Sequence, residues 1–368
     1  MLIRHALASA LMLLPNLAIA QTPAPNSPPK RFVSPWASVT QPPVPIDPLE
    51  LVLNAEPVQG VEQRAAVLKL LNNAQNLSNV RRGPYDLKTQ FKSSEGIWQI
   101  EESSPVRSIR RLSVQGPSYS SVNLLLDDVL YGEQPLRAIP LRVAQEHWAT
   151  FGHFTFFGPR ALLRVATGNL NGVQLTCVLG SFRSEGSGPR RWDENEWCID
   201  PQSGFIVTYS PVPGHYILYD YTNAHHLRDI TLPGKFTIVE SQETALEVEV
   251  VSLTEPVNTD KSTYSSAGLI ALGVGFPLAS GQTWHDMEIP GALAGHPATG
   301  GQFVVVRAMI APDGSVSEPQ VLASSAPGLN QRALERAAQP RIMRTLKQQN
   351  GATPQSGQTF FITLFVTN

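Results

Sequence analysis

The chain has 368 residues, of which 42% are hydrophobic and 16% are charged, a composition that supports about two folded domains and excludes a disordered or fibrous protein. Its 28 Lys and Arg residues nearly balance its 30 Asp and Glu residues, so the formal net charge is only -2. Without a strong basic field, nucleic acid is not an expected partner. Abundant Gly and Pro favour short strands and turns over a helical bundle, and we expect an α+β or mostly β fold.

The first twenty residues have the pattern of a signal peptide. The basic residue Arg4 precedes a largely apolar run over Ala6–Leu17, and Ala18-Ile19-Ala20 then precedes the polar Gln21, as at a small-x-small cleavage site. The apolar run is shorter than the roughly 20 residues that a membrane-spanning helix needs. We therefore predict a signal peptide over 1–20 and a periplasmic protein. The alternative is an uncleaved N-terminus that anchors the chain in the inner membrane.

A proline-rich segment follows over 21–48, with nine prolines in 28 residues. This density favours extended polyproline II and prevents a packed core, so we interpret the segment as a tether. Folded sequence begins near Leu51. In Val61–Leu77, the apolar residues Val61, Ala65, Leu68 and Leu71 lie near one helical stripe, which predicts an amphipathic helix at the start of the folded part.

Alternation of apolar and polar residues predicts strands from residue 85 onwards. Apolar side chains occupy every second position in Tyr85–Phe91, Phe205–Tyr209 and Leu246–Val250, the pattern of strands with one buried face. Further β-rich segments lie at 97–101, 119–126 and 215–221. A second helix is predicted over Pro140–Thr150, because proline is well tolerated in the first turn of a helix. A large antiparallel sheet is the natural assembly of these strands.

Cys177 and Cys198 are the only cysteines in the chain. Each lies in a strand-like segment, Val173–Gly180 or Glu196–Asp200, and a polar loop joins the two, so the cysteines can face each other across a hairpin. In an oxidising compartment such a pair is expected to form a disulfide. A zinc site is the alternative, but neither a C-x-x-C motif nor a nearby His at metal-ligand spacing supports it, and we predict no metal site.

Motifs for catalysis and cofactor binding are missing from the sequence. It contains no G-x-S-x-G or H-E-x-x-H, and Gly273 and Gly275 are followed by Phe-Pro rather than by a helix start, so no nucleotide cofactor is expected. The adjacent His225 and His226 would point to opposite faces of a strand and would not easily share a metal. We expect a non-enzymatic protein without catalytic residues. A hydrolase assembled from distant residues is the alternative.

A short acidic segment lies beside two tryptophans. Asp193, Glu194 and Glu196 could form the pair of carboxylates that glycoside hydrolases use. Because Arg190 and Arg191 lie just before this segment, we interpret it instead as a solvated hairpin tip.

The C-terminal part of the chain has a recognisable order of elements. Gln302–Ile310 and Val316–Leu322 flank a Pro-Asp-Gly turn and predict a hairpin; Leu329–Ala337 predicts a helix and Phe360–Val366 a last strand. This order, with the sequence VVRAMIAPDGSVSEPQVLASSAPGLNQRALERAA, resembles the TonB C-terminal domain family over about 301–368.

The resemblance implies a small ββαβ domain whose exposed sheet edge pairs with an extended segment of an outer-membrane transporter or another envelope protein. The last strand is the expected partner-binding edge, formed by Phe360, Phe361, Ile362, Thr363, Leu364, Phe365 and Val366. The alternative is that this strand lies inside its sheet or at an edge guarded against pairing.

Residues 50–255 resemble the LolA/LolB-like lipoprotein-carrier fold, through a helix followed by the PYDLKTQF strand, many further strands and the segment WCIDPQSGFIVTYS. The resemblance implies a half-barrel-like sheet closed by helices over an apolar cavity that binds lipid or acyl chains. The expected lining is aromatic and comprises Phe91, Trp98, Trp197, Phe205 and Tyr209. Packing in an ordinary core is the alternative reading of the same residues.

The predicted fold class is therefore α+β. A large antiparallel, half-barrel-like sheet with covering helices spans 50–255, a linker spans 256–300 and a TonB-C-terminal-like ββαβ domain spans 301–368. The expected function is that of a non-enzymatic periplasmic envelope protein of the TonB-like type, which contacts an outer-membrane transporter or another envelope partner in transport. The alternative is a periplasmic lipid or lipoprotein carrier that uses an apolar cavity in the β domain.

Overall fold

The computed structural model describes residues 54–93, 96–106, 108–126, 129–132, 147, 161–181, 186–191, 193–257, 264–265, 267–268, 276–277, 293–294, 302–311, 313, 315–339 and 359–366. All of them belong to one compact unit, Trp36–Asn368. The signal peptide and the tether predicted over 1–48 lie outside the described residues, as does the helix predicted over 140–150 except for His147. In the described part of the chain, no helix is both long and apolar enough to cross a membrane.

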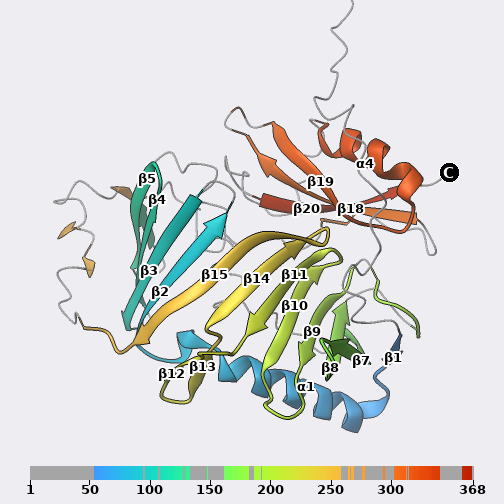
Figure 1. Ribbon diagram of the computed structural model, residues 1–368, viewed down its shortest axis with the longest axis horizontal. Helices are drawn as coiled ribbons and strands as arrows, with labels where there is room; N and C mark the ends of the chain where they lie inside the picture. Colours follow the sequence, from blue (N-terminus) through green and yellow to red (C-terminus); the bar gives the residue numbers. More distant parts are fainter. Residues whose placement is uncertain are drawn as a thin grey trace, which may run out of the picture. The chain divides into compact units, whose positions relative to one another are not determined.

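Fourteen strands form one large sheet in which every pairing is antiparallel, in the order β1-β7-β8-β9-β10-β11-β14-β15-β2-β3-β4-β5-β6-β16 (Figure 1). Their bounds are Ala55–Pro57 (β1), Tyr85–Ser93 (β2), Gly96–Val106 (β3), Ile109–Gly116 (β4), Tyr119–Leu126 (β5), Val129–Gly132 (β6), Leu162–Leu170 (β7), Val173–Ser181 (β8), Asn195–Ile199 (β9), Ile206–Val212 (β10), His215–Asp220 (β11), Lys235–Glu240 (β14), Glu243–Thr254 (β15) and Phe276–Pro277 (β16).

Two runs of consecutive strands meet inside this sheet. Strands β2 to β6 follow one another through hairpins, and so do β7 to β11, while β14 and β15 extend the second run. β15 then pairs with β2, with Val248 opposite Phe91. The sheet is therefore continuous only because strands far apart in the sequence pair at its middle.

One face of the large sheet holds the main hydrophobic core. Alternate residues of β2 and β3 point into it, as the period-two pattern predicts. The helix α1 (Gly60–Leu77) lies across this face and buries Val67, Leu71 and Ala74 against the sheet (Figure 1). The helix expected over Val61–Leu77 is thus confirmed to within one residue.

A separate two-stranded hairpin carries the adjacent histidines. It consists of β12 (His225–Leu227) and β13 (Ile230–Leu232). His225 is half-buried and His226 is exposed, as expected for neighbours that point to opposite sides of a strand.

The C-terminal elements form a four-stranded sheet in the order β17-β20-β18-β19. Its strands are β17 (Leu293–Ala294), β18 (Gln302–Ile310), β19 (Val316–Ser324) and β20 (Thr359–Val366). After a 3-10 turn at Pro327–Leu329, the helix α4 (Asn330–Ala337) packs Ala333, Leu334 and Ala337 against the apolar residues of β18. The hairpin, the helix and the last strand predicted from the sequence are all present.

A buried polar cluster and two turns connect the two sheets. The Glu240 carboxylate at the end of β14 lies 3.1 Å from Nδ1 of His215 and 3.1 Å from Nε of Arg307 in β18. The hydroxyl of Ser241 donates a hydrogen bond to the carbonyl of Val321 in β19. Because all three charged or titratable side chains are buried, separating the sheets would expose or unpair them.

The predicted α+β fold class is wrong, because the described residues are mostly strand. They contain two α-helices, α1 and α4, against twenty strands. The physical reason is that hairpin turns connect most consecutive segments, so that the period-two pattern continues from strand to strand and few residues remain for a helical layer. The predicted linker over 256–300 also contributes strands, since β16 joins the large sheet and β17 the small one.

Candidate functional site

The α1-side face of the large sheet is the candidate binding surface. Its buried apolar side chains come from strands on both sides of the β15–β2 pair. On the β2–β4 side they are Leu87, Phe91, Trp98, Ile100, Leu112 and Val114. We call this second group the β2–β4 apolar surface.

The helix α1 is too short to cover the whole face. With 18 residues it spans about 27 Å at a rise of about 1.5 Å per residue. A sheet of 14 strands is about 60 Å wide at a strand spacing of about 4.8 Å. A helix lying across the strands therefore reaches at most half of them. The side chains of the β2–β4 apolar surface are nevertheless at most 4% exposed, so other parts of the chain cover them.

Trp98 lies at the centre of this surface with an unusual environment. Its side chain is only 4% exposed, its ring packs 6.2 Å from that of Tyr119, and the absent side chain of Gly116 leaves room for the indole. The indole Nε1 has no hydrogen-bond partner among the described residues. A buried donor without a partner is costly.

A charged cluster is buried beside the apolar side chains. The Glu102 carboxylate accepts a hydrogen bond from the Tyr85 hydroxyl and lies 3.2 Å from Nε of Arg110. Nε2 of His147 lies 2.7 Å from the other carboxylate oxygen, and Nδ1 of the same ring lies 3.4 Å from the Thr89 hydroxyl. His147 thus contacts both β2 and β3 and is itself fully buried.

The Glu102 carboxylate is ionised although it is buried. Burial alone would raise its pKa, but the hydrogen bond from His147 and the positive charge of Arg110 outweigh burial and lower the pKa to about 2. Glu102 therefore carries a negative charge inside the fold, and the positive charge of Arg110 compensates it. The Glu102 carboxylate holds His147 against the sheet through the contact with Nε2. The imidazole also packs 6.2 Å from the ring of Phe91.

Sequence reasoning missed this cluster. One feature of the sequence could have indicated it. Glu102 follows Trp98 and Ile100 at every second position of β3, so its side chain points to the same inward face. An ionisable residue at an inward position must find buried partners, and no local pattern shows that Arg110 and His147 would supply them.

Four of the five aromatic residues expected to line a cavity belong to this core. Phe91, Trp98, Trp197 and Tyr209 are buried in it, and the rings of Trp197 and Tyr209 stack 5.4 Å apart. Phe205 is only half-buried and stacks on Tyr221 instead, with ring centroids 4.3 Å apart. The structure therefore does not bring Phe205 together with the other four.

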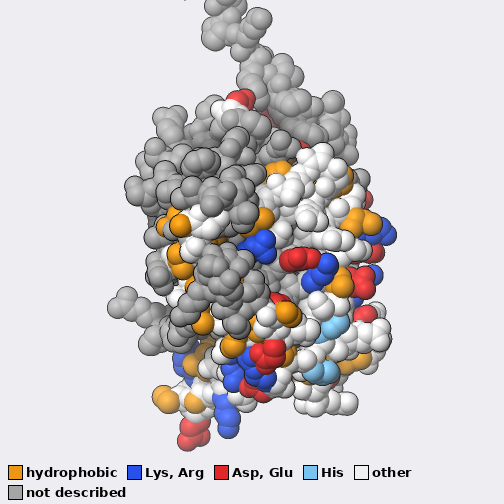
Figure 2. All heavy atoms as spheres, turned by 90° about the vertical axis from the view of Figure 1, so that its left-hand side faces the viewer, with side chains coloured by type: hydrophobic (Ala, Val, Ile, Leu, Met, Phe, Trp, Pro, Cys, Tyr) orange, Lys and Arg blue, Asp and Glu red, His pale blue; other side chains and the backbone are white. Residues whose placement is uncertain are grey.

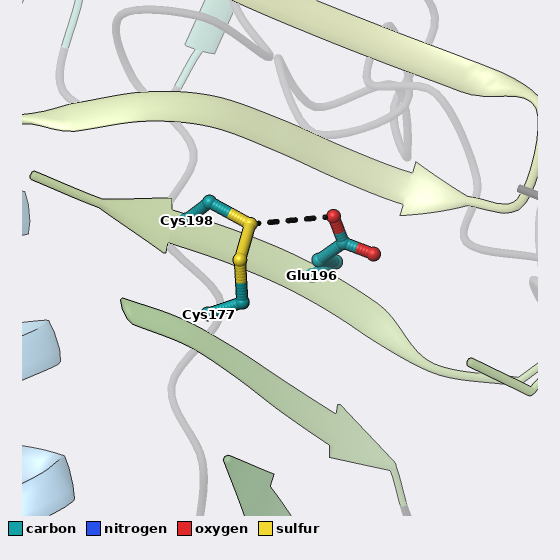
Figure 3. Close-up of side chains that lie close together, drawn as sticks. All are labelled: Cys177, Glu196 and Cys198. Atoms are coloured by element: carbon teal, nitrogen blue, oxygen red, sulfur yellow. Dashed lines mark hydrogen bonds between the residues drawn. A yellow bond between two sulfur atoms is a disulfide. The ribbon is translucent and has the colours of Figure 1, made fainter. Parts of the chain in front are cut away.

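The predicted disulfide between Cys177 and Cys198 is confirmed. The two residues are direct partners in the β8–β9 ladder, and both are fully buried. Figure 3 shows the carboxylate of Glu196 beside the bridge, with Oε1 3.4 Å from Sγ of Cys198. The bridge lies in a second hydrophobic cluster, distinct from the one that α1 covers.

The expected solvated tip at residues 193–196 is wrong for its two glutamates. Glu194 forms a two-pronged ion pair with Arg164, at 2.6 and 2.7 Å, and Glu196 lies 3.3 Å from Arg190. All four side chains are at most 2% exposed. The arginines also donate to backbone carbonyls of the same loop, so the charges hold the loop against the sheet. No carboxylate pair for sugar chemistry results.

A polar cavity of about 330 Å³ opens on the large sheet between β2, β11, β14 and β15. It is lined by Gln90, Lys92, Asp220, Thr222, Asn223, His225, Gly234, Lys235, Glu247, Val248, Glu249 and Val250. None of the five expected aromatic residues lines it. Figure 2 shows side chains of both charges close together on one face of the molecule, which suits the near-zero net charge better than a surface that steers one kind of ion.

The strand proposed for partner binding, β20, lies between β18 and β17. It pairs with β18 over Thr359–Val366 and with the two-residue strand β17 at Ile362 and Thr363. The pairing partner on its second side is therefore short among the described residues. Its role in binding a partner stays a prediction.

Comparisons with known proteins add little to this geometry. No protein-family model and no curated protein matches the chain. Similar solved structures include a DUF1329 family protein from Desulfovibrio piger, with 7% identity and a TM-score of 0.31 over 55% of this chain and 98% of that one. MucB has 13% identity and a TM-score of 0.27 over 55% of this chain and 63% of its own. The MucA/MucB complex from Pseudomonas aeruginosa gives 12% identity and a TM-score of 0.27 over 57% and 62%.

At such low identities and TM-scores, these similarities say nothing about what the chain binds. The expected resemblance to the TonB C-terminal domain family finds no support among the comparisons. The large antiparallel sheet with α1 across one face is consistent with the second expected resemblance, to the LolA/LolB-like carriers.

Proposed function

We propose that the protein is a non-enzymatic periplasmic binding protein or carrier that holds the apolar part of a lipid, such as an acyl chain, on the β2–β4 apolar surface. The observation that supports this most directly is the mismatch between α1 and the sheet, because the apolar face continues beyond the reach of the helix. An acyl chain bound there takes the place of the cover that now buries these side chains. An acyl chain gains about 0.8 kcal/mol for each buried CH₂ group, so a surface of this kind binds lipid without any specific polar contact.

Two features make the β2–β4 apolar surface better suited to a ligand than the part beneath α1. The Trp98 indole N–H offers a donor without a partner among the described residues. Glu102 and Arg110 form a buried charged border on the same strands. Apolar surface with a few placed polar groups is the usual composition of a ligand site. The charged border fixes His147, which packs against Phe91 inside the surface.

The compartment and the absence of catalysis belong to the same proposal. The signal-peptide pattern of residues 1–20 and the disulfide both suit an exported protein. In the described residues, the buried carboxylates of Glu102, Glu194 and Glu240 are committed to ion pairs with arginine or histidine, which gives them a structural role rather than that of a catalytic acid or base.

Tryptophan quenching tests the proposal on the full chain. A fatty acid brominated along its chain quenches only indoles that it touches, so the titration should lower the fluorescence of the wild-type protein. The quenching should be lost in Trp98→Phe and kept in Trp197→Phe. The second variant is a matched control because Trp197 lies in the same hydrophobic core but stacks on Tyr209, away from β2–β4.

Two results would contradict the proposal. The first is the absence of quenching in a wild-type protein that is folded by circular dichroism and stripped of lipid by organic extraction. The second is equal quenching in the wild type and in Trp98→Phe, because the fatty acid would then bind elsewhere.

A further inference from the structure

The disulfide lies within a set of polar side chains that the fold places on one face of three strands. Cys177 in β8 and Cys198 in β9 are direct ladder partners. Glu196 lies two residues before Cys198 and therefore on the same face of β9. Thr208 in β10 is the ladder partner of Cys198 on its other side, and directly opposed residues share a face. Two sulfurs, a carboxylate and a hydroxyl thus lie on the same face of neighbouring strands.

The atoms that reduction of the disulfide would make available as ligands already lie close together. One sulfur from each cysteine and one carboxylate oxygen of Glu196 all lie within 4.8 Å of one another (Figure 3). All three residues are fully buried. Thiolate and carboxylate are both zinc ligands, at about 2.3 Å for sulfur and about 2.1 Å for oxygen. Spacing in the sequence hides the set, because the cysteines are joined by strand pairing and not by a C-x-x-C turn.

Two neighbours of the set suit a buried metal. Zn²⁺ with two thiolates and one carboxylate has a net charge of -1, and Arg190 lies 3.3 Å from Oε2 of Glu196 to balance it. A partner of this kind also orients the ligand carboxylate. The Thr208 hydroxyl is fully buried and has no hydrogen-bond partner among the described residues. It can bind a water molecule in the fourth zinc position.

We propose that the reduced form of the protein binds one Zn²⁺ through Cys177, Cys198 and Glu196, with water as the fourth ligand. The disulfide and the metal site are then alternative states of the same residues. The oxidised protein has no such site, because its sulfurs are bonded to each other. This inference concerns a different cluster from the lipid surface and does not depend on it.

The change of state balances with a thiol as reductant. Two thiol molecules give up two electrons and two protons and become a disulfide, while the Cys177–Cys198 bond breaks and leaves two thiols. Zinc binding then releases both thiol protons, because the metal takes thiolates. Bound zinc therefore protects the two thiolates from oxidation. Once the disulfide does form, the metal is released.

Cobalt is the probe for the test, because a thiolate bound to Co²⁺ gives a charge-transfer band in the near ultraviolet, whereas zinc is colourless. The full chain is reduced with a phosphine without oxygen, and Co²⁺ is added. We expect one Co²⁺ per chain, with the band in the reduced protein and none in the oxidised protein. Glu196→Gln should weaken cobalt binding at least about tenfold, while Glu249→Gln, an exposed glutamate in β15, should leave it unchanged.

Absence of the charge-transfer band in a reduced, folded chain would overturn the proposal. So would an affinity of Glu196→Gln for Co²⁺ equal to that of the wild type. Circular dichroism covers the case in which reduction unfolds the chain. Zinc should then restore the native spectrum of the wild type and fail to restore that of Cys177→Ser, since metal binding contributes folding free energy. Failure of zinc to restore the wild type would equally overturn the proposal.

Discussion

Gly116 lies directly beneath the indole ring of Trp98. A Cβ atom at position 116 would come within 2.1 Å of two ring carbons, far closer than any real contact. The strand thus gives up a side chain at this position so that a large aromatic ring can lie over its backbone, as glycines in strands often do where another group approaches closely.

This relationship predicts the effect of Gly116→Ala. The added methyl group must displace the Trp98 ring, and overpacking of a core costs about 1–3 kcal/mol. We expect a loss of this size in the free energy of unfolding measured with urea. Gly328→Ala is the control, because no atom lies within 4 Å of a Cβ at that position. Equal stability of the two variants would show that the ring does not lie over Gly116.

Replacement of Glu102 should be among the most destabilising conservative changes in the chain. Glu102→Gln removes the charge that Arg110 and His147 face, and breaking a buried ion pair costs about 3–5 kcal/mol. Glu101→Gln is the neighbouring control, because its pair with Lys88 is about half exposed and such pairs contribute less than about 1 kcal/mol. Urea unfolding of both variants measures the difference. Similar losses would contradict the buried cluster.

The pKa of Glu102 predicts a loss of stability in acid. Its pKa is lowered from an ordinary 4.5 to about 2 in the folded state. The stabilisation is therefore complete above about pH 5 and is lost as the pH falls towards 2. A shift of this size corresponds to about 3 kcal/mol. Over this range, the stability of the wild type should fall more steeply than that of Glu102→Gln. Parallel pH profiles would contradict the assignment.

The disulfide should stabilise the fold by limiting the unfolded chain. Its cysteines are 21 residues apart, and a loop of that size corresponds to about 3 kcal/mol in the chain-entropy account. The double variant Cys177→Ser, Cys198→Ser should lose about this much stability. A thiol reductant should lower the unfolding midpoint of the wild type and leave that of the double variant unchanged, whereas an effect on both would point to something other than the bridge.

The contact between the two sheets can be tested at Gly214. A Cβ there would lie 2.3 Å from the carbonyl oxygen of Leu322 in β19, at a φ of +86°. Gly172 has nearly the same φ, +85°, and nothing within 4 Å of its Cβ. Alanine at either site incurs the backbone penalty of about 1–2 kcal/mol. Only Gly214→Ala should also separate the sheets and turn one calorimetric unfolding transition into two.

Much of the local structure could be predicted because it depends on neighbours in the sequence. The alternation of Tyr85–Phe91 determines which side chains of β2 point inward, and the apolar run of α1 predicts that a helix forms there. The predicted stripe does not give its buried side, because Val61 is 85% exposed and the helix buries Val67 and Ala74 instead. The cysteines could be paired because a single hairpin brings their strands together. Each of these inferences needs only residues that lie close along the chain.

The remaining features depend on which distant strands become neighbours. Alternation gives the same pattern for any partner, so nothing in β2 shows that β15 pairs with it. The ion pair of Arg164 with Glu194 was hidden for the same reason, since both look like surface residues until the loop closes on β7. The inward position of Glu102 in β3 indicates that it needs a buried partner. The sequence around its partner His147 shows no alternation that would place that histidine beside it.

The pairing of β15 with β2 has a consequence for the order in which the protein folds. Contacts between residues far apart in the chain form slowly, because closing the long intervening loop costs entropy before the contact is gained. The middle of the large sheet consists of such a pair. A chain that emerges N-terminus first thus completes this sheet only after residue 254 has emerged, and until then the edge of β2 that pairs with β15 is open to pairing with other unfolded chains.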